Sequence, residues 1–377
     1  MEFRDLKKQY QVLKVDIDTA ISHVLCNAGF ISGKQVKELE EQLAEYVGVK
    51  HCITCANGTD ALTLALMAWK IGVGDAVFIP DFTFFSTGES PALLGAHPVF
   101  VDIDADTYNM DPKCLEEAII RLKKERKYIP KVVIAVDLFG QPADYREIRR
   151  ICNQYGLLLL EDGAQGFGGV MDGKKVCSFG DISTTSFFPA KPLGCYGDGG
   201  AIFTNHEEWA AQIRSLAVHG KNMEDKYDNV RLGMNSRLDT LQAAILLVKL
   251  KAFQEYELEA VNRVADWYRE HLFGSGIELP VVKEGYVSSW AQYTIKLPEE
   301  VNRNRLQEKL KEDGIPTMIY YRKPMHLQGA FENIESNTQC PVAEKVCNQV
   351  LSLPMHPYLN PKDVSNIVNT LKKQRME

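Results

Sequence analysis

Short apolar runs alternate with segments of helical spacing through the first half of the chain. A short continuous apolar run is typical of a strand that is buried on both faces of a parallel sheet. Apolar residues three and four positions apart predict a helix that buries one face. The runs lie at residues 52–56, 76–80, 99–104, 132–138, 157–160, 182–188 and 201–204, and the helical segments lie at 34–47, 61–69, 111–124 and 145–154. Strands that alternate with helices in this way predict an α/β fold with a mostly parallel sheet.

A helix is also predicted before these elements, at residues 3–26. Its apolar positions are Val12, Val15, Ile17, Ile21, Val24 and Leu25. The helix is expected to end at residues 27–29, where Gly29 is available for a left-handed cap. The helix at 34–47 should bury a face made of Val36, Leu39, Leu43 and Tyr46.

The second half of the chain has a different pattern. Residues 214–220 are expected to close the strand region of a large domain, and the polar residues 222–232 to form an exposed loop. A long helix is predicted from Ser236 to about His271, a length typical of a helix that bridges two domains or subunits. Strands at 290–297 and 317–321 and helices at 299–312, 342–350 and 363–373 predict a smaller α+β domain. The predicted domains are therefore 1–250 and 251–377, and the second includes the end of the long helix.

Composition and charge narrow the functional classes. The chain has 377 residues, of which 45% are hydrophobic and 25% charged, with a formal net charge of −7. That charge argues against a general nucleic-acid surface, and no apolar run is long enough for a membrane span. Nine scattered cysteines, together with a charged N-terminus, predict reduced thiols in a cytoplasmic protein. Cys52 and Cys55 form a single CxxC. This predicts small buried side chains rather than a zinc site, because a structural zinc ion needs four ligands.

Residues 157–201 carry the candidate chemistry. The apolar run at 157–160 ends at two carboxylates, Glu161 and Asp162, and the run at 182–188 is followed by Lys191 and a glycine-rich segment. Ligands of open α/β sheets bind beyond the carboxyl ends of the strands, so Asp162 and Lys191 should meet there. A pyridoxal phosphate site needs this pair, because a lysine forms the Schiff base and an acid pairs with the pyridinium nitrogen. Glu161 should face the other way on an extended strand.

The segments FFPAKPLGCYGDGGAIFT and NSRLDTLQAAIL make the resemblance specific. The chain resembles, over nearly its whole length, the nucleotide-sugar aminotransferase family of fold-type-I pyridoxal phosphate enzymes, and is most similar to the branch that aminates UDP-linked 3-keto sugars. The resemblance implies the aspartate aminotransferase-like fold, with a large cofactor-binding domain and a smaller C-terminal one. It also implies pyridoxal 5′-phosphate as cofactor and pyridoxamine 5′-phosphate as its intermediate form.

The same resemblance assigns cofactor contacts. NGTDAL is similar to the family's phosphate cradle, which implies Gly58 and Thr59; an ordinary capped helix is the alternative. PDFTFFST is similar to a signature whose aromatic residue stacks on the pyridine ring, and the match falls on Phe84, although Phe82 and Phe85 have the same chemistry. The remaining implied contacts are Gln165 to the ring oxygen, Ser186 to the phosphate, and Asn235 to the phosphate from a neighbouring subunit. Lys191 would also act as general base and acid.

The substrate contacts are implied in the same way. An arginine at Arg237 would meet the carboxylate of a uronic acid sugar, and a surface charge at a helix start is the alternative. Tyr320, Tyr321 and His326 lie where the family often has H-Y-P-x-P-L-H-x-Q, and this chain departs from it at Tyr320 and Arg322.

The implied function is amino transfer from an amino acid, L-glutamate by resemblance, to a nucleotide-linked keto-sugar in cell-surface polysaccharide (O-antigen or capsule) biosynthesis. The first candidate acceptor is UDP-2-acetamido-2-deoxy-3-oxo-D-glucuronate, and a dTDP- or UDP-linked 4-keto or 3-keto 6-deoxysugar is the alternative. The enzyme is expected to be a homodimer with a shared active site, without nucleic-acid or membrane partners. A catalytically silent scaffold or sensor on the same fold is the more distant alternative, and it would be expected to lack the lysine or its acid partner.

Overall fold

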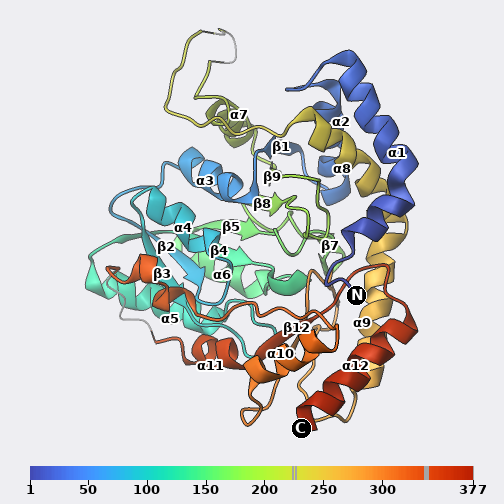
Figure 1. The fold of residues 1–377 in the computed structure, drawn as a ribbon. Helices are drawn as coiled ribbons and strands as arrows, with labels where there is room; N and C mark the ends of the chain where they lie inside the picture. The colour runs from blue at the N-terminus through green and yellow to red at the C-terminus, as the bar shows by residue number, and fades with distance from the viewer. Residues whose placement is uncertain (223–224, 226, 335–338, 377) are drawn as a thin grey trace.

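A seven-stranded sheet forms the centre of the protein in a computed structural model that describes residues 1–222, 225, 227–334 and 339–376 (Figure 1). The strand order is β1-β9-β8-β5-β4-β2-β3. Within this sheet β9 runs antiparallel to both of its neighbours, and the pairs from β8 to β3 are parallel. The strands are β1 (His51–Cys55), β2 (Asp75–Pro80), β3 (His97–Val101), β4 (Ile129–Val136), β5 (Leu158–Asp162), β8 (Ile182–Ser186) and β9 (Gly200–Thr204). The prediction of a mostly parallel α/β sheet is confirmed.

Helices cover both faces of this sheet, so its strands alternate between two cores. In β4, Val132 and Ile134 face one core while Val133 faces the other. The first core is closed by α3 (Gly58–Ala68) and α7 (Glu207–Leu216). The helices on the opposite face are α2 (Lys34–Val47), α5 (Pro112–Glu125), α6 (Tyr145–Tyr155) and α8 (Thr240–Ala252). This double burial explains why the strands are continuous apolar runs in the sequence.

The C-terminal third has a core of its own. It lies between α9 (Leu258–Leu272), α10 (Arg303–Glu312), α12 (Pro361–Met376) and a two-stranded sheet, β11 (Tyr293–Lys296) with β12 (Val350–Leu353). The short strands β6 (Val170–Met171), β7 (Lys174–Lys175) and β10 (Tyr286–Val287) form a third sheet. The domain boundary at 250/251 stays a prediction. Within the described residues, no helix is both long and apolar enough to cross a membrane.

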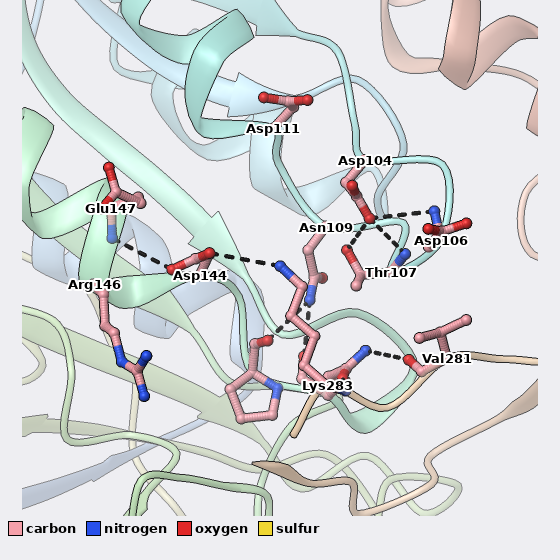
Figure 2. A network of polar contacts seen from close by, with 12 residues as sticks. Asp104, Asp106, Thr107, Asn109, Asp111, Asp144, Arg146, Glu147, Val281 and Lys283 are labelled. Atoms are coloured by element: carbon pink, nitrogen blue, oxygen red, sulfur yellow. Dashed lines mark hydrogen bonds and ion pairs between the residues drawn. The ribbon is translucent and has the colours of Figure 1, made fainter. Parts of the chain in front are cut away.

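Figure 2 shows polar contacts that hold the segment entering this C-terminal part against the large sheet's loops. Lys283 Nζ lies 3.5 Å from Asp144 Oδ2, and Gln141 Nε2 donates to the Val281 carbonyl at 2.8 Å. Asn109 Nδ2 in turn donates to the Gln141 carbonyl at 3.0 Å. The loop after β4 therefore anchors this segment at residues 281 and 283, and Asn109, in the loop after β3, supports Gln141.

The first helix, α1 (Leu6–Asn27), differs from its prediction in its buried face. Its buried apolar residues are Leu13, Ile17 and Val24, whereas Val12 and Val15 are 51% and 77% exposed. Leu13 and Ile17 share a core with Ile245 of α8, and this contact sets the face. The left-handed cap is Ala28, with φ 49°, and not Gly29. The predicted face of α2 is confirmed, because Leu39 and Leu43 are buried and Val36 and Tyr46 pack beside them.

Three other expectations are wrong. Residues 214–220 are not strand; the helix α7 occupies residues through Leu216. The long helix starts at Thr240 rather than Ser236 and contains a π-helical turn at Phe253–Glu257 between α8 and α9. Residues 317–321 make one isolated bridge, Met318 with Ser352, rather than a strand. Part of the predicted exposed loop at 222–232 lies outside the described residues. The helices α4 (Ser86–Leu93) and α11 (Pro341–Gln349) complete the main elements.

Candidate active site

The loops that follow five strands meet at the carboxyl edge of the central sheet. The parallel strands β8, β5, β4 and β2 all end there, and β1, antiparallel to β9, runs in the same direction. Asp162 ends β5, Ser186 ends β8, and Gly58 opens α3 directly after β1. The predicted cofactor residues on these strands therefore lie on one edge, as expected for a ligand site in an open α/β sheet.

Lys191 lies in a tight loop after β8. Its backbone N–H donates to the Phe188 carbonyl at 2.9 Å, and the loop is closed by Phe187 N donating to the Gly199 carbonyl at 2.7 Å. Burial lowers the pKa of the Lys191 amine; the carboxylate of Asp162 opposes this effect and the guanidinium of Arg4 adds to it. An amine with a lowered pKa is more often unprotonated, which is the form that attacks a carbonyl.

Asp162 is held on two sides. Its Oδ2 accepts from Thr87 Oγ1 at 3.1 Å, and its Oδ1 accepts from the Ala164 N–H at 3.2 Å. Burial raises the pKa of Asp162, against the lowering effects of these hydrogen bonds and of Lys191. Glu161 faces the other way, as predicted, and its Oε2 accepts from Ser183 Oγ at 2.7 Å. Thr87 was missed by the sequence reasoning, although it lies inside the quoted PDFTFFST motif.

The start of α3 forms a cradle of hydroxyl and N–H donors. Asn57 caps the helix by accepting from the Asp60 N–H at 2.8 Å, and within the described part of the chain no acceptor is recorded for the N–H groups of Gly58 and Thr59. A Cβ at Gly58 would lie 2.7 Å from the Cβ of Ser186, so glycine is required for this approach. Thr59 Oγ1 lies 2.6 Å from Ser86 Oγ. These donors at a helix N-terminus fit a phosphate.

The three phenylalanines of the motif have separate environments. Phe82 is 1% exposed and packs edge-on to Phe139 and Tyr321. Phe85 packs against Phe331 with ring centroids 5.3 Å apart. Phe84 is 53% exposed, and its ring centroid is 6.5 Å from that of Tyr321. Phe84 is thus the one of the three whose face is available to a planar ligand.

Gln165 and Tyr321 link the sheet edge to the C-terminal part. Gln165 Oε1 accepts from the Phe139 N–H and its Nε2 lies 2.9 Å from the Tyr321 hydroxyl. Tyr321 therefore lies between Gln165 and the rings of Phe82 and Phe84. Its neighbour Tyr320 points to the N-terminal segment, with its ring centroid 6.3 Å from that of Phe3.

Other predicted residues lie elsewhere. Asn235 and Arg237 are exposed and bond to each other, with Arg237 donating to Asn235 Oδ1 at 2.7 Å. His326 lies 2.6 Å from Asp81 Oδ2, and the Asp81 hydrogen bond raises the pKa of His326. Cys340 completes a compact group with these two side chains. Within one chain, none of Asn235, Arg237 and His326 has a recorded contact with Lys191 or Asp162 among the described residues.

Arg4 was missed, and it lies beside the lysine loop. Its Nη2 donates to the Pro192 carbonyl at 3.2 Å, across 188 positions in the sequence. Burial lowers the pKa of Arg4 to about 10, opposed chiefly by Glu257. No local pattern signals this contact, because it depends on how the N-terminal segment returns to the centre of the molecule.

Known proteins are similar to this chain over nearly its whole length. Residues 11–372 match the model of the DegT/DnrJ/EryC1/StrS aminotransferase family. The chain belongs to this family. It is 46% identical to the UDP-2-acetamido-2-deoxy-3-oxo-D-glucuronate aminotransferase of Pseudomonas aeruginosa, over 98% of this chain and 99% of that protein. It is also 42% identical to a pleiotropic regulatory protein of Geobacillus stearothermophilus, over 97% of this chain and 96% of that protein.

Solved structures superpose on nearly the whole of this chain. A DegT/DnrJ/EryC1/StrS aminotransferase from Brucella abortus superposes with a TM-score of 0.96 at 47% identity, covering 100% of both chains. NtdA from Bacillus subtilis, solved with bound pyridoxamine phosphate, superposes with a TM-score of 0.85 at 32% identity, covering 96% of this chain and 82% of that one. The family member described here is a pyridoxal phosphate-dependent aminotransferase of fold type I, and its cradle, exposed Phe84 and Lys191–Asp162 pair fit that cofactor.

Proposed function

We propose that this aminotransferase moves an amino group from L-glutamate to UDP-2-acetamido-2-deoxy-3-oxo-D-glucuronate. The observation that carries the proposal is that Lys191 and the buried Asp162 lie close enough at the carboxyl edge of the sheet for each to shift the pKa of the other, while burial lowers the pKa of the lysine. The choice of acceptor rests on the 46% identity to the P. aeruginosa enzyme named for that substrate. A 4-keto or 3-keto 6-deoxysugar linked to dTDP or UDP is the alternative acceptor.

The proposed roles follow from the contacts of each side chain. Gly58, Thr59 and Ser186 hold the cofactor phosphate, Phe84 stacks on the ring, and Gln165 contacts the ring oxygen. Asp162 keeps the ring nitrogen protonated through its negative charge, since Thr87 and the Ala164 N–H stabilise the charged form. The bound cofactor supplies an electron sink. Lys191 then moves a proton between the substrate's α-carbon and the cofactor's C4′.

We further propose a homodimer whose two active sites are shared. Asn235 and Arg237 are exposed in one chain, which fits a role toward a neighbouring subunit's cofactor phosphate and a sugar carboxylate. The exposed apolar side chains of α1, Val12 and Val15, support an apolar contact with a second copy. Tyr320, Tyr321 and His326 stay candidate substrate contacts. Nine free cysteines fit the proposed cytoplasmic location in cell-surface polysaccharide biosynthesis.

Absorption spectroscopy tests the first half-reaction. The purified protein is loaded with pyridoxal phosphate and mixed with L-glutamate, in wild type and Lys191→Ala. We expect the visible band of the lysine-bound cofactor in wild type only, and its conversion by glutamate to the spectrum of pyridoxamine phosphate. UDP- and dTDP-linked 3- and 4-keto sugars are then tested as amine acceptors. A wild-type protein that never forms the lysine-bound band would overturn the cofactor role of Lys191.

A regulatory role is the second candidate. It is favoured by the 42% identity to a protein named as a pleiotropic regulator. A sensor built on this fold has no need for the lysine and its acid partner. Both are present here: burial lowers the pKa of Lys191, and Asp162 accepts a hydrogen bond from Thr87. Absence of any glutamate-dependent spectral change, with the cofactor bound, would favour the regulatory role.

A further inference from the structure

The N-terminal segment 3–5 lies between the lysine loop and the C-terminal part of the chain. The Met355 N–H donates to the Phe3 carbonyl at 3.0 Å, and the Phe3 ring lies against Tyr320. On the other side, Asp5 caps α1 by accepting from the Lys8 N–H at 2.8 Å. The contacts of Phe3 and Asp5 thus hold the backbone on both sides of Arg4. The Arg4 side chain reaches the carbonyl of Pro192, the residue after Lys191. In Figure 1 the N-terminus lies beside α9, on the side of that helix that faces the central sheet.

The guanidinium of Arg4 has unused donor capacity at this position. Arginine has five N–H donors. Among the described residues, the one side-chain hydrogen bond recorded for Arg4 goes to the Pro192 carbonyl. No carboxylate of the described chain lies within ion-pair distance of it. The carboxylate with the largest effect on its pKa, Glu257, is already bonded to Gln9 and Tyr358.

The surroundings of Arg4 carry an excess of basic groups. Lys249 is 1% exposed, burial lowers its pKa to about 8, and Arg4 contributes to that shift. Arg4 likewise contributes to the lowered pKa of Lys191. Two partly or fully buried amines and one guanidinium therefore share the buried carboxylates of Glu257 and Asp162. An additional negative charge would be favourable here.

We propose that Arg4 is a substrate-binding residue that receives a carboxylate next to the reacting amine of Lys191. A planar guanidinium with free N–H groups matches the two oxygens of a carboxylate. The inference deepens the proposed function and rests on it, because both proposed substrates offer this chemistry: the amino acid donor carries carboxylates, and the keto-sugar carries a uronic acid. The cofactor phosphate has its own donors at Gly58 and Thr59, at the start of α3.

Binding to the pyridoxamine phosphate-loaded protein separates the two sources. Calorimetry measures Kd for glutarate, a dicarboxylate without a keto group, and for UDP-glucuronate and UDP-glucose, which differ by one carboxylate. The variants are Arg4→Gln, which keeps an amide donor for Pro192, and Arg4→Lys, which keeps the charge. Lys7→Gln is the matched control, because Lys7 lies just after this segment, in the first turn of α1, and is exposed, paired with Glu2 at 3.1 Å.

Loss of a charge-assisted hydrogen bond is expected to weaken binding about ten- to hundredfold in Arg4→Gln. A weaker Kd for glutarate alone assigns Arg4 to the amino acid donor. A weaker Kd for UDP-glucuronate, with UDP-glucose unchanged, assigns it to the sugar, and losses for both mean that it serves both half-reactions. In each supporting case Arg4→Lys recovers part of the affinity and Lys7→Gln has wild-type values.

The proposal is overturned if Arg4→Gln binds glutarate and UDP-glucuronate as wild type does, or if UDP-glucose is weakened as much as UDP-glucuronate while glutarate is unchanged. Both results leave the proposed amino transfer intact, since that is tested by the glutamate-dependent spectrum of Lys191. Thermal unfolding of each variant, followed by circular dichroism, checks that the N-terminal segment is still docked; if Arg4→Gln unfolds, the comparison of Arg4→Lys with Lys7→Gln decides by the same criteria.

Discussion

Thr87 Oγ1 donates to Asp162 Oδ2 at 3.1 Å, and Thr83 Oγ1 lies 3.1 Å from Thr87 Oγ1 in turn. Thr83 lies in the loop after β2 and Thr87 in the first turn of α4, whereas Asp162 ends β5, so a segment that follows another strand holds this carboxyl group. The hydrogen bond from Thr87 lowers the pKa of Asp162, which burial raises. The pKa of Asp162 therefore depends on a side chain that follows β2 as well as on the backbone next to Asp162.

Thr87→Val should test this relationship. Without the hydroxyl, the pKa of Asp162 rises, so the acidic limb of the kcat/KM profile should move to higher pH. We expect kcat/KM near neutral pH to fall about tenfold, the loss that follows from about 1.4 kcal/mol of transition-state stabilisation. The measurement is a pH profile of glutamate-dependent conversion.

Thr185→Val is the matched control for Thr87→Val. Thr185 is also fully buried, and its hydroxyl donates to the Gly163 carbonyl at 3.2 Å rather than to Asp162. An equal shift of the acidic limb in both variants would show that loss of any buried hydroxyl near β5 is enough, and would contradict the assigned role of Thr87.

The proposed phosphate cradle makes a second prediction, at Gly58. In Gly58→Ala the new Cβ would meet the Cβ of Ser186 at 2.7 Å, so the start of α3 must shift away from β8. Overpacking of this kind costs about 1–3 kcal/mol, and we expect pyridoxal phosphate to bind about ten- to hundredfold more weakly. Equilibrium titration of the apoprotein with pyridoxal phosphate measures this affinity. Gly29→Ala, where nothing lies within 4 Å of the added Cβ, is the control.

Two residues of the candidate site, Asp162 and Lys191, are predicted by their places after strand ends, and the resemblance to the family implies the other predicted residues. Alternation along β5 separates Asp162 from Glu161, and Lys191 follows the next parallel strand, so short-range patterns place both. Arg4 and Thr87 could not be placed in the same way. Their partners are 188 and 75 positions away, and the contacts depend on three-dimensional packing rather than on local spacing.

The fold also has parts that local sequence patterns predict and parts that depend on three-dimensional packing. The buried strands are recognisable because both faces are apolar, but two local assignments fail where tertiary contacts decide. Residues 317–321 have strand-like composition, yet the chain leaves β12 after one bridge and places Tyr321 against Phe82 and Phe84. In α7, Ala210, Ile213 and Leu216 have helical spacing, and the helix buries these three side chains in the core on one face of the central sheet.

Phe84 makes a third prediction, about stacking. Its ring is half exposed, whereas that of Phe85 packs on Phe331. Aromatic pairs contribute about 0.5–1.5 kcal/mol beyond burial, so Phe84→Leu should weaken pyridoxal phosphate binding about three- to tenfold with little change in Tm. Phe85→Leu should lower Tm and leave cofactor affinity unchanged. Titration with pyridoxal phosphate and thermal unfolding of both variants measure these two quantities. Weaker cofactor binding in Phe85→Leu, with wild-type affinity in Phe84→Leu, would assign stacking to Phe85.

His356 makes the last prediction, about acid stability. The side chain is 4% exposed, its Nδ1 has no hydrogen-bond partner among the described residues, and burial lowers its pKa to about 4. An unfolded histidine titrates near about 6.5. Because the folded pKa is depressed, the stabilising contribution of neutral His356 is present above about pH 6.5 and is lost as the pH falls toward 4.

At pH 5 this loss amounts to about 2 kcal/mol of unfolding free energy relative to pH 7.5, from the two pKa values alone. His356→Gln has no charge to gain, so its free energy of unfolding should fall less than that of wild type between these pH values, by about that amount. Urea unfolding at both pH values measures the difference. His23→Gln is the control, because His23 lies on the exposed side of α1. Parallel losses in wild type and His356→Gln would mean that His356 accepts a proton without leaving its buried position, and the linkage argument would then be wrong.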